Sequence, residues 1–113
     1  MLRSKVDESL QLAENVQDSM ITRLRRNYSG VKDLGVKRGP FYVLVGASMA
    51  SILTEIAFVS NPREARRLRT AKYRQALAEG IAEGIAKFVG VPLRRKRISS
   101  DQMEARSPQK AAR

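Results

Sequence analysis

The first regular pattern along the chain is a stripe of apolar residues spaced three or four positions apart, and it predicts an amphipathic helix over residues 7–27. The stripe consists of Leu10, Ala13, Val16, Met20 and Leu24. Ser4 or Asp7 offers a cap at its start, and Gly30 follows its end. A helix with a single apolar stripe needs one surface to pack against. The glycine-rich residues 29–40 that follow are predicted to form a polar loop.

Two continuous apolar runs come next, and both are typical of β-strands that are covered on two faces. The first is residues 41–45, between Gly39-Pro40 and Gly46, and the second is residues 52–59. Alternation in the second run assigns two faces: Ile52, Thr54, Ile56 and Phe58 on one, and Leu53, Glu55, Ala57 and Val59 on the other. Because two strands do not complete a sheet, their neighbours are expected to come from elsewhere.

The remaining pattern predicts a short basic helix and then a long one. Asn61 has the position of an N-cap, with Pro62 at the first helical position of the short helix, residues 62–69. The long helix carries a second stripe made of Tyr73, Leu77, Ile81, Ile85 and Phe88. Beside it Gly80 and Gly84 predict close packing of the helix backbone on a sheet, and the helix is expected to end at Gly90-Val91-Pro92.

The predicted order is therefore helix, strand, strand, short helix, long helix, which is an α/β pattern with too few strands. We expect residues 1–90 to be one end of a larger α/β domain. Residues 91–113 have little apolar content and no periodicity, so they are predicted to be a basic disordered tail.

The distribution of charge agrees with this division into a domain and a tail. The formal charge is +11: residues 1–90 carry 15 Lys/Arg against 9 Asp/Glu, and residues 91–113 carry 7 against 2. The cluster Arg94, Arg95, Lys96 and Arg97 is the densest run of positive charge in the tail. Such a cluster binds nucleic acid, anionic lipid or an acidic wall polymer non-specifically, or it is simply a solvated tail without a partner.

Composition excludes several classes of protein. There is no cysteine, which excludes a disulfide framework, and no histidine, which leaves only carboxylates for a zinc site. We therefore expect no metal to be bound by this chain alone. The N-terminal residues MLRSKVDESLQ lack the apolar core of a signal peptide, and no apolar run has the length of a membrane span.

Glu55 is the one carboxylate in the apolar run of residues 52–59. An ionised carboxylate inside a core costs several kcal/mol unless it is paired, bound to a metal or protonated. Two explanations stay open at this point: an ion pair with one of the many arginines, or a place in a functional site.

Three segments together resemble a known family. They are S-L-x-L-A-x-x-V-Q (residues 9–17), G-V-K-x-x-P-F-Y-V-L (residues 35–44) and S-I-L-T-E-I-A-F-V-S-N-P (residues 51–62). Their order and spacing are similar to the C-terminal half of the zinc-dependent N-acetylmuramoyl-L-alanine amidases, over residues 4–89. The resemblance implies a mixed-sheet, three-layer α/β domain. It also implies hydrolysis of the amide between N-acetylmuramic acid and L-alanine in peptidoglycan, in the periplasm or outside the cell.

The resemblance implies a catalytic role for Glu55, which matches the glutamate of the family's V-E-x-G-F-x-S-N motif. Amide hydrolysis needs a carboxylate that moves protons between water and the leaving nitrogen, next to a Lewis acid. Two departures are mild: Met49-Ala50-Ser51 replaces M-P-S, and Ala57 replaces glycine.

A third departure is larger, because the two histidines and the glutamate that hold zinc in the family lie in an N-terminal half that this chain lacks. We therefore expect a fragment that is inactive alone, with zinc only in the complete domain. The alternative is a small basic protein that binds nucleic acid or an anionic wall polymer without catalysis, although its few aromatic residues do not suggest a base-stacking platform.

Overall fold

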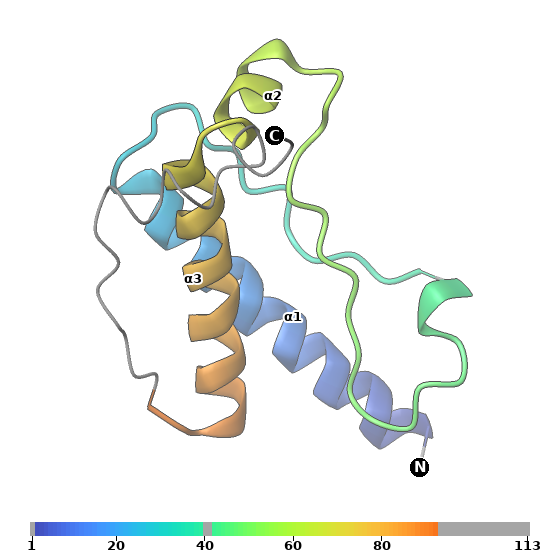
Figure 1. Ribbon diagram of the computed structural model, residues 1–113. Helices are drawn as coiled ribbons and strands as arrows, with labels where there is room; N and C mark the ends of the chain where they lie inside the picture. Colours follow the sequence, from blue (N-terminus) through green and yellow to red (C-terminus); the bar gives the residue numbers. More distant parts are fainter. Residues whose placement is uncertain (1, 40–41, 93–113) are drawn as a thin grey trace, which may run out of the picture.

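The computed structural model describes residues 2–39 and 42–92, and within them the chain is helical. The elements are α1 (Leu2–Arg25), a single 3₁₀ turn η1 (Tyr42–Leu44), α2 (Pro62–Leu68) and α3 (Ala71–Val89) (Figure 1). The three predicted helices are thus confirmed. α1 begins earlier than predicted, since no glycine or proline precedes Gly30 to interrupt it. The predicted tail lies, from residue 93 onward, outside the described residues.

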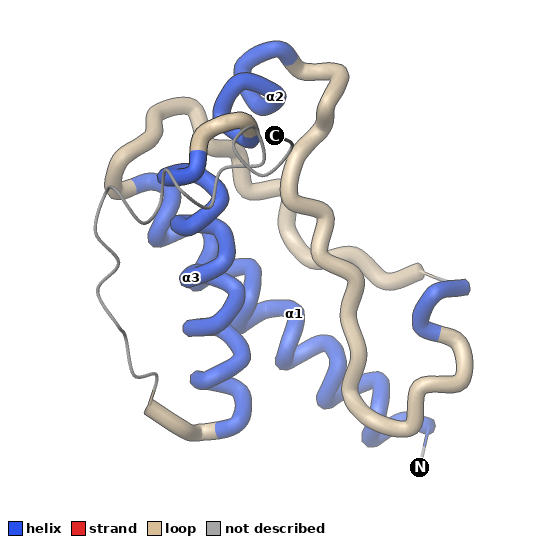
Figure 2. The backbone as a smooth tube through the Cα atoms, in the orientation of Figure 1, coloured by secondary structure: helices blue, strands red, loops and turns tan. Residues whose placement is uncertain are grey.

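The expected α/β fold with a mixed sheet is wrong for this chain. No strand occurs in residues 2–39 and 42–92, and Figure 2 shows the region between α1 and α2 as loop apart from η1. The first predicted strand forms η1 instead, and residues 50–58 have no regular secondary structure. The reason is physical: a strand satisfies its backbone groups only on a neighbouring strand, and the described part of the chain supplies none.

Local signals placed the start of α2 and the end of α3 correctly. The Asn61 side chain accepts hydrogen bonds from the backbone N–H groups of Arg63 (3.0 Å) and Glu64 (3.3 Å), which makes it the predicted N-cap of α2. Gly90 ends α3 in the left-handed conformation, with φ of 74°. The cap of α3 was not predicted: Thr70 accepts a hydrogen bond from the Tyr73 backbone N–H at 3.3 Å.

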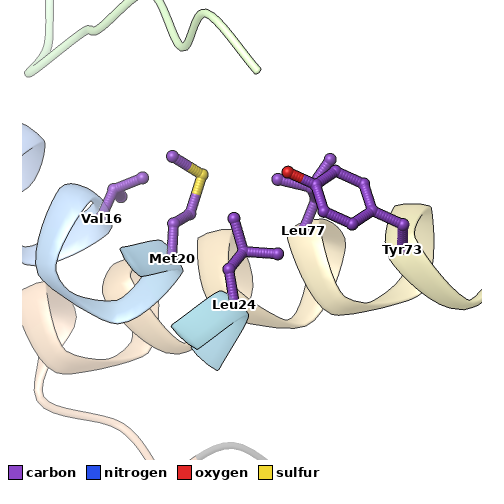
Figure 3. Close-up of a cluster of buried hydrophobic side chains, with 5 residues drawn as sticks. All are labelled: Val16, Met20, Leu24, Tyr73 and Leu77. Carbon is purple, nitrogen blue, oxygen red and sulfur yellow. The ribbon is translucent and has the colours of Figure 1, made fainter. Parts of the chain in front are cut away.

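The core is formed by α1 and α3, which pack antiparallel to each other (Figure 1). Figure 3 shows its buried side chains: Val16, Met20 and Leu24 from α1, and Leu77 and Tyr73 from α3. The two apolar stripes predicted from the sequence therefore pack against one another. The G-x-x-x-G of α3 also packs against α1 and not against a sheet as expected, since a Cβ on Gly80 would lie 2.7 Å from the Met20 Cα.

Candidate functional site

The segment that contains Glu55 runs as an open stretch of chain from the N-terminal end of α1 toward α2 (Figure 1). Its start is held on α1 by hydrogen bonds. The Ser51 backbone N–H donates to the Ser9 hydroxyl oxygen at 3.0 Å, and the Lys5 ammonium donates to the Ala47 carbonyl. Ile52 packs against the edge of the core. Beyond Ile52, the segment departs from the packed interior.

The backbone of residues 52–57 makes no hydrogen bond within the described part of the chain; the bond of the Asn61 N–H to the Phe58 carbonyl, at 2.9 Å, only closes the turn before α2. The apolar side chains of the segment are largely exposed, with 44% for Ile56, 53% for Phe58 and 78% for Val59. The expectation that residues 52–59 form a strand covered on two faces is therefore wrong for this chain. Within the described part of the chain, residues 52–57 thus combine a backbone without hydrogen bonds with partly uncovered apolar side chains.

Glu55 is exposed, so it does not lie in a core. Across residues 2–39 and 42–92, ion pairs are formed only by Arg23, and the Glu55 carboxylate has no hydrogen-bond partner there. The first explanation for Glu55, an ion pair with an arginine, is thus not found. The segment therefore holds the carboxylate in solvent.

A second element of the family resemblance lies in the loop after α1. The Gln17 side-chain amide donates to the Asp33 carboxylate at 2.8 Å, and the Gly35 backbone N–H donates to the same carboxylate oxygen at 2.9 Å. The hydrogen bond from Gln17 has the larger effect and the one from Gly35 the smaller, and both lower the pKa of Asp33 below its ordinary value. They attach the loop to α1.

Sequence reasoning missed the ion pairs that join the two long helices. The Arg23 guanidinium of α1 lies 2.7 Å from the Glu79 carboxylate and also contacts the Glu83 carboxylate, both on α3. All three side chains are largely covered. The sequence did contain a signal for these ion pairs. Glu79 and Glu83 are one helical turn apart beside the second stripe, so both side chains lie on the same side of α3 and can reach one residue of a packed helix.

Comparison with known proteins decides the family. The profile of the N-acetylmuramoyl-L-alanine amidases matches residues 1–87, from the start of α1 almost to the end of α3. The chain belongs to this family. No solved structure matches the chain.

Several curated amidases are similar to this chain. An uncharacterized cell wall amidase of Bacillus anthracis is 40% identical over 83 residues, which is 74% of this chain and 15% of that protein. The N-acetylmuramoyl-L-alanine amidase LytC of Bacillus subtilis is 35% identical over 80 residues, 71% of this chain and 15% of that protein. The N-acetylmuramoyl-L-alanine amidase AmiC of Escherichia coli is 34% identical over 85 residues, 74% of this chain and 19% of that protein. The predicted family membership is confirmed, and the chain spans only a small fraction of these amidases.

The described residues of this amidase chain do not fit a metal site. They contain no group of three or more His, Cys, Asp or Glu side chains that could hold an ion. Within the same residues no helix has the length and apolarity needed to cross a membrane. What the segment offers chemically is therefore a single exposed carboxylate, Glu55, on an unpaired stretch of backbone.

Proposed function

We propose that this chain is the C-terminal segment of a zinc-dependent N-acetylmuramoyl-L-alanine amidase. The complete enzyme hydrolyses the amide between N-acetylmuramic acid and L-alanine in peptidoglycan, in the periplasm or outside the cell, and the segment alone is inactive. The observation that carries the proposal is the family match over residues 1–87 in a chain that spans 15% to 37% of the first curated relatives.

The state of residues 50–58 supports this proposal. Their apolar side chains are exposed, and the backbone of residues 52–57 forms no hydrogen bond among the described residues, so this surface lacks packing neighbours. The rest of the amidase domain would supply those neighbours.

The role proposed for Glu55 is proton transfer. Its carboxylate takes a proton from the water that attacks the amide carbonyl and delivers a proton to the leaving nitrogen. The zinc ion expected in the family has no ligand set among the described residues, so its ligands would belong to the rest of the amidase domain. This chain contributes the carboxylate and the helical layer that carries it.

The test restores the domain. The chain is fused to the amino-terminal region of a related amidase, and release of muramoyl-linked peptide is measured with and without Glu55→Gln, a change that preserves size. We expect the rate per folded molecule to fall by about 10²–10⁴-fold, the usual contribution of general acid–base catalysis. Glu8→Gln, which alters an exposed carboxylate on α1, is the matched control and should leave the rate unchanged.

The result also separates the two explanations of Glu55. If the fusion is active and Glu55→Gln retains full turnover but melts at a lower temperature, Glu55 is structural and its catalytic role is rejected. If the unmodified fusion binds metal and folds but does not cleave the amide, the proposed activity itself is wrong.

A further inference from the structure

Positive charge is concentrated at one end of the helical pair. Residues 63–74, which form α2 and the first turn of α3, contain Arg63, Arg66, Arg67, Arg69, Lys72 and Arg74 but one acid, Glu64. The last turn of α1 and the residue after it add Arg25 and Arg26. The acids of α1 and α3 lie farther from this end: Asp7, Glu8, Glu14, Asp18, Glu79 and Glu83. Because α1 and α3 are antiparallel, their basic ends coincide (Figure 1).

Some of these cations hold the end together. The Arg67 guanidinium donates to the Ser29 carbonyl at 2.8 Å and lies 5.1 Å from the centre of the Tyr28 ring. The Tyr28 ring in turn meets the Tyr73 ring edge to face, with centroids 4.8 Å apart. Arg74 donates to the Leu68 carbonyl at 2.6 Å. These contacts fix α2 against the end of α1 and the start of α3.

The side chains of five other cations form no hydrogen bond or ion pair among the described residues. Arg26, Arg63, Arg66, Arg69 and Lys72 are exposed, and we call them the basic end. None of them forms an ion pair with an acid in the described ranges, where the ion pairs are those of Arg23. Lys72 even lies in the first turn of α3, where the helix dipole disfavours a cation and no acidic residue compensates it. Within the described ranges no acid neutralises this charge, which is therefore available to a partner.

We propose that the basic end binds a phosphate-bearing anionic polymer of the cell wall. This rests on the proposed function, which places the enzyme at the cell wall. The five cations are spread over α2 and the adjoining helix ends, which suits a polymer that carries many negative groups, and their attraction holds the amidase near its substrate. A polyanion that binds to cations releases its counterions, which favours binding. This requires only that the cations are positively charged and exposed to solvent, and the residues of the basic end are both.

Two other polyanions fit the surface less well. A nucleic-acid surface for single strands would show exposed aromatic rings beside the cations, but Tyr28 lies under Arg67 and Tyr73 is buried. A membrane-surface helix would show exposed large apolar side chains, and α2 has none.

The test uses the full chain and poly(glycerol phosphate) as the probe, with binding followed as a function of salt. The variant Arg66→Gln/Arg69→Gln/Lys72→Gln removes three charges from the basic end. The control Lys37→Gln/Arg38→Gln/Lys87→Gln removes three exposed charges elsewhere. We expect the first variant to bind about tenfold more weakly or worse, with a salt slope reduced by about two to three, and the control to change about twofold or less.

A charge-preserving variant, Arg66→Lys/Arg69→Lys, should keep wild-type binding, and circular dichroism should show the same helix content for all variants. The proposal is overturned if both triple variants lose affinity equally, or if Arg94→Gln/Arg95→Gln/Arg97→Gln abolishes binding while the basic-end variant retains it. If the chain binds duplex DNA or phosphatidylglycerol vesicles more tightly than poly(glycerol phosphate) at the same salt concentration, the proposed partner is wrong. None of these measurements depends on hydrolysis, so failure of the amidase activity leaves the binding result independent.

Discussion

Gly84 of α3 lies directly against the backbone of Val16 in α1: a Cβ built on Gly84 would lie 2.7 Å from the Val16 nitrogen and 2.8 Å from the Asn15 carbonyl oxygen. Backbone atoms cannot yield as a flexible side chain can, so the two helices approach this closely only because position 84 has no side chain. Gly80, which precedes Gly84 by one helical turn, makes the same kind of contact with Met20.

Adding one methyl group at this contact should therefore destabilise the chain. We expect Gly84→Ala to lower the free energy of unfolding by about 1–3 kcal/mol through overpacking, although alanine gains about 1 kcal/mol in helix propensity. Denaturant unfolding followed by helix signal measures the change. Ala78→Gly, at an exposed position of α3, calibrates the propensity effect. A Gly84→Ala variant that is more stable than wild type would show that the helices do not meet there.

The Arg23 ion pairs should contribute to the same helix contact. In Arg23→Met the covered carboxylates of Glu79 and Glu83 lose their shared cation, and we expect a loss of about 1–3 kcal/mol, since these groups are neither fully buried nor fully exposed. Arg26→Met, at an exposed position three residues later in the chain, is the control. Equal stability of the two variants would mean that the ion pairs contribute nothing measurable.

Unfolding should also respond to high pH through Tyr73. Burial, above all, raises the pKa of the Tyr73 phenol above its ordinary value of about 10. Above pH 10 the Tyr73 phenol keeps its proton in the folded state but loses it in the unfolded state. The contribution of Tyr73 to the free energy of unfolding is therefore constant below pH 10 and falls as the pH rises toward the folded pKa. Tyr73→Phe should flatten this fall. Unfolding curves measured between about pH 8 and 11 test it, and an equally steep fall in the variant would exclude Tyr73 as the cause.

The unpaired segment should make the isolated chain self-associate. Residues 52–57 have backbone groups without hydrogen-bond partners among the described residues, and side chains such as Ile56 are partly exposed, which favours pairing between copies. We expect sedimentation to show concentration-dependent association that Ile56→Lys reduces, because a charge opposes strand pairing at an edge. Val91→Lys, at an exposed apolar position after α3, should have little effect. A monomer at all concentrations would contradict this expectation.

The presence of the three helices, the cap of α2, the end of α3 and the family were determined by the sequence itself. Helix hydrogen bonds and caps join residues close in the chain, so Asn61, Gly90 and the two apolar stripes carried enough information to place α1, α2 and α3. The family motifs are likewise strings of neighbouring residues. Only the tertiary structure decided what those elements meet: Gly80 and Gly84 pack on α1, Arg23 reaches α3, and Glu55 lies in solvent. The predicted strands failed for the same reason, because a strand depends on partners far away in the chain, and residues 50–58 have none among the described residues.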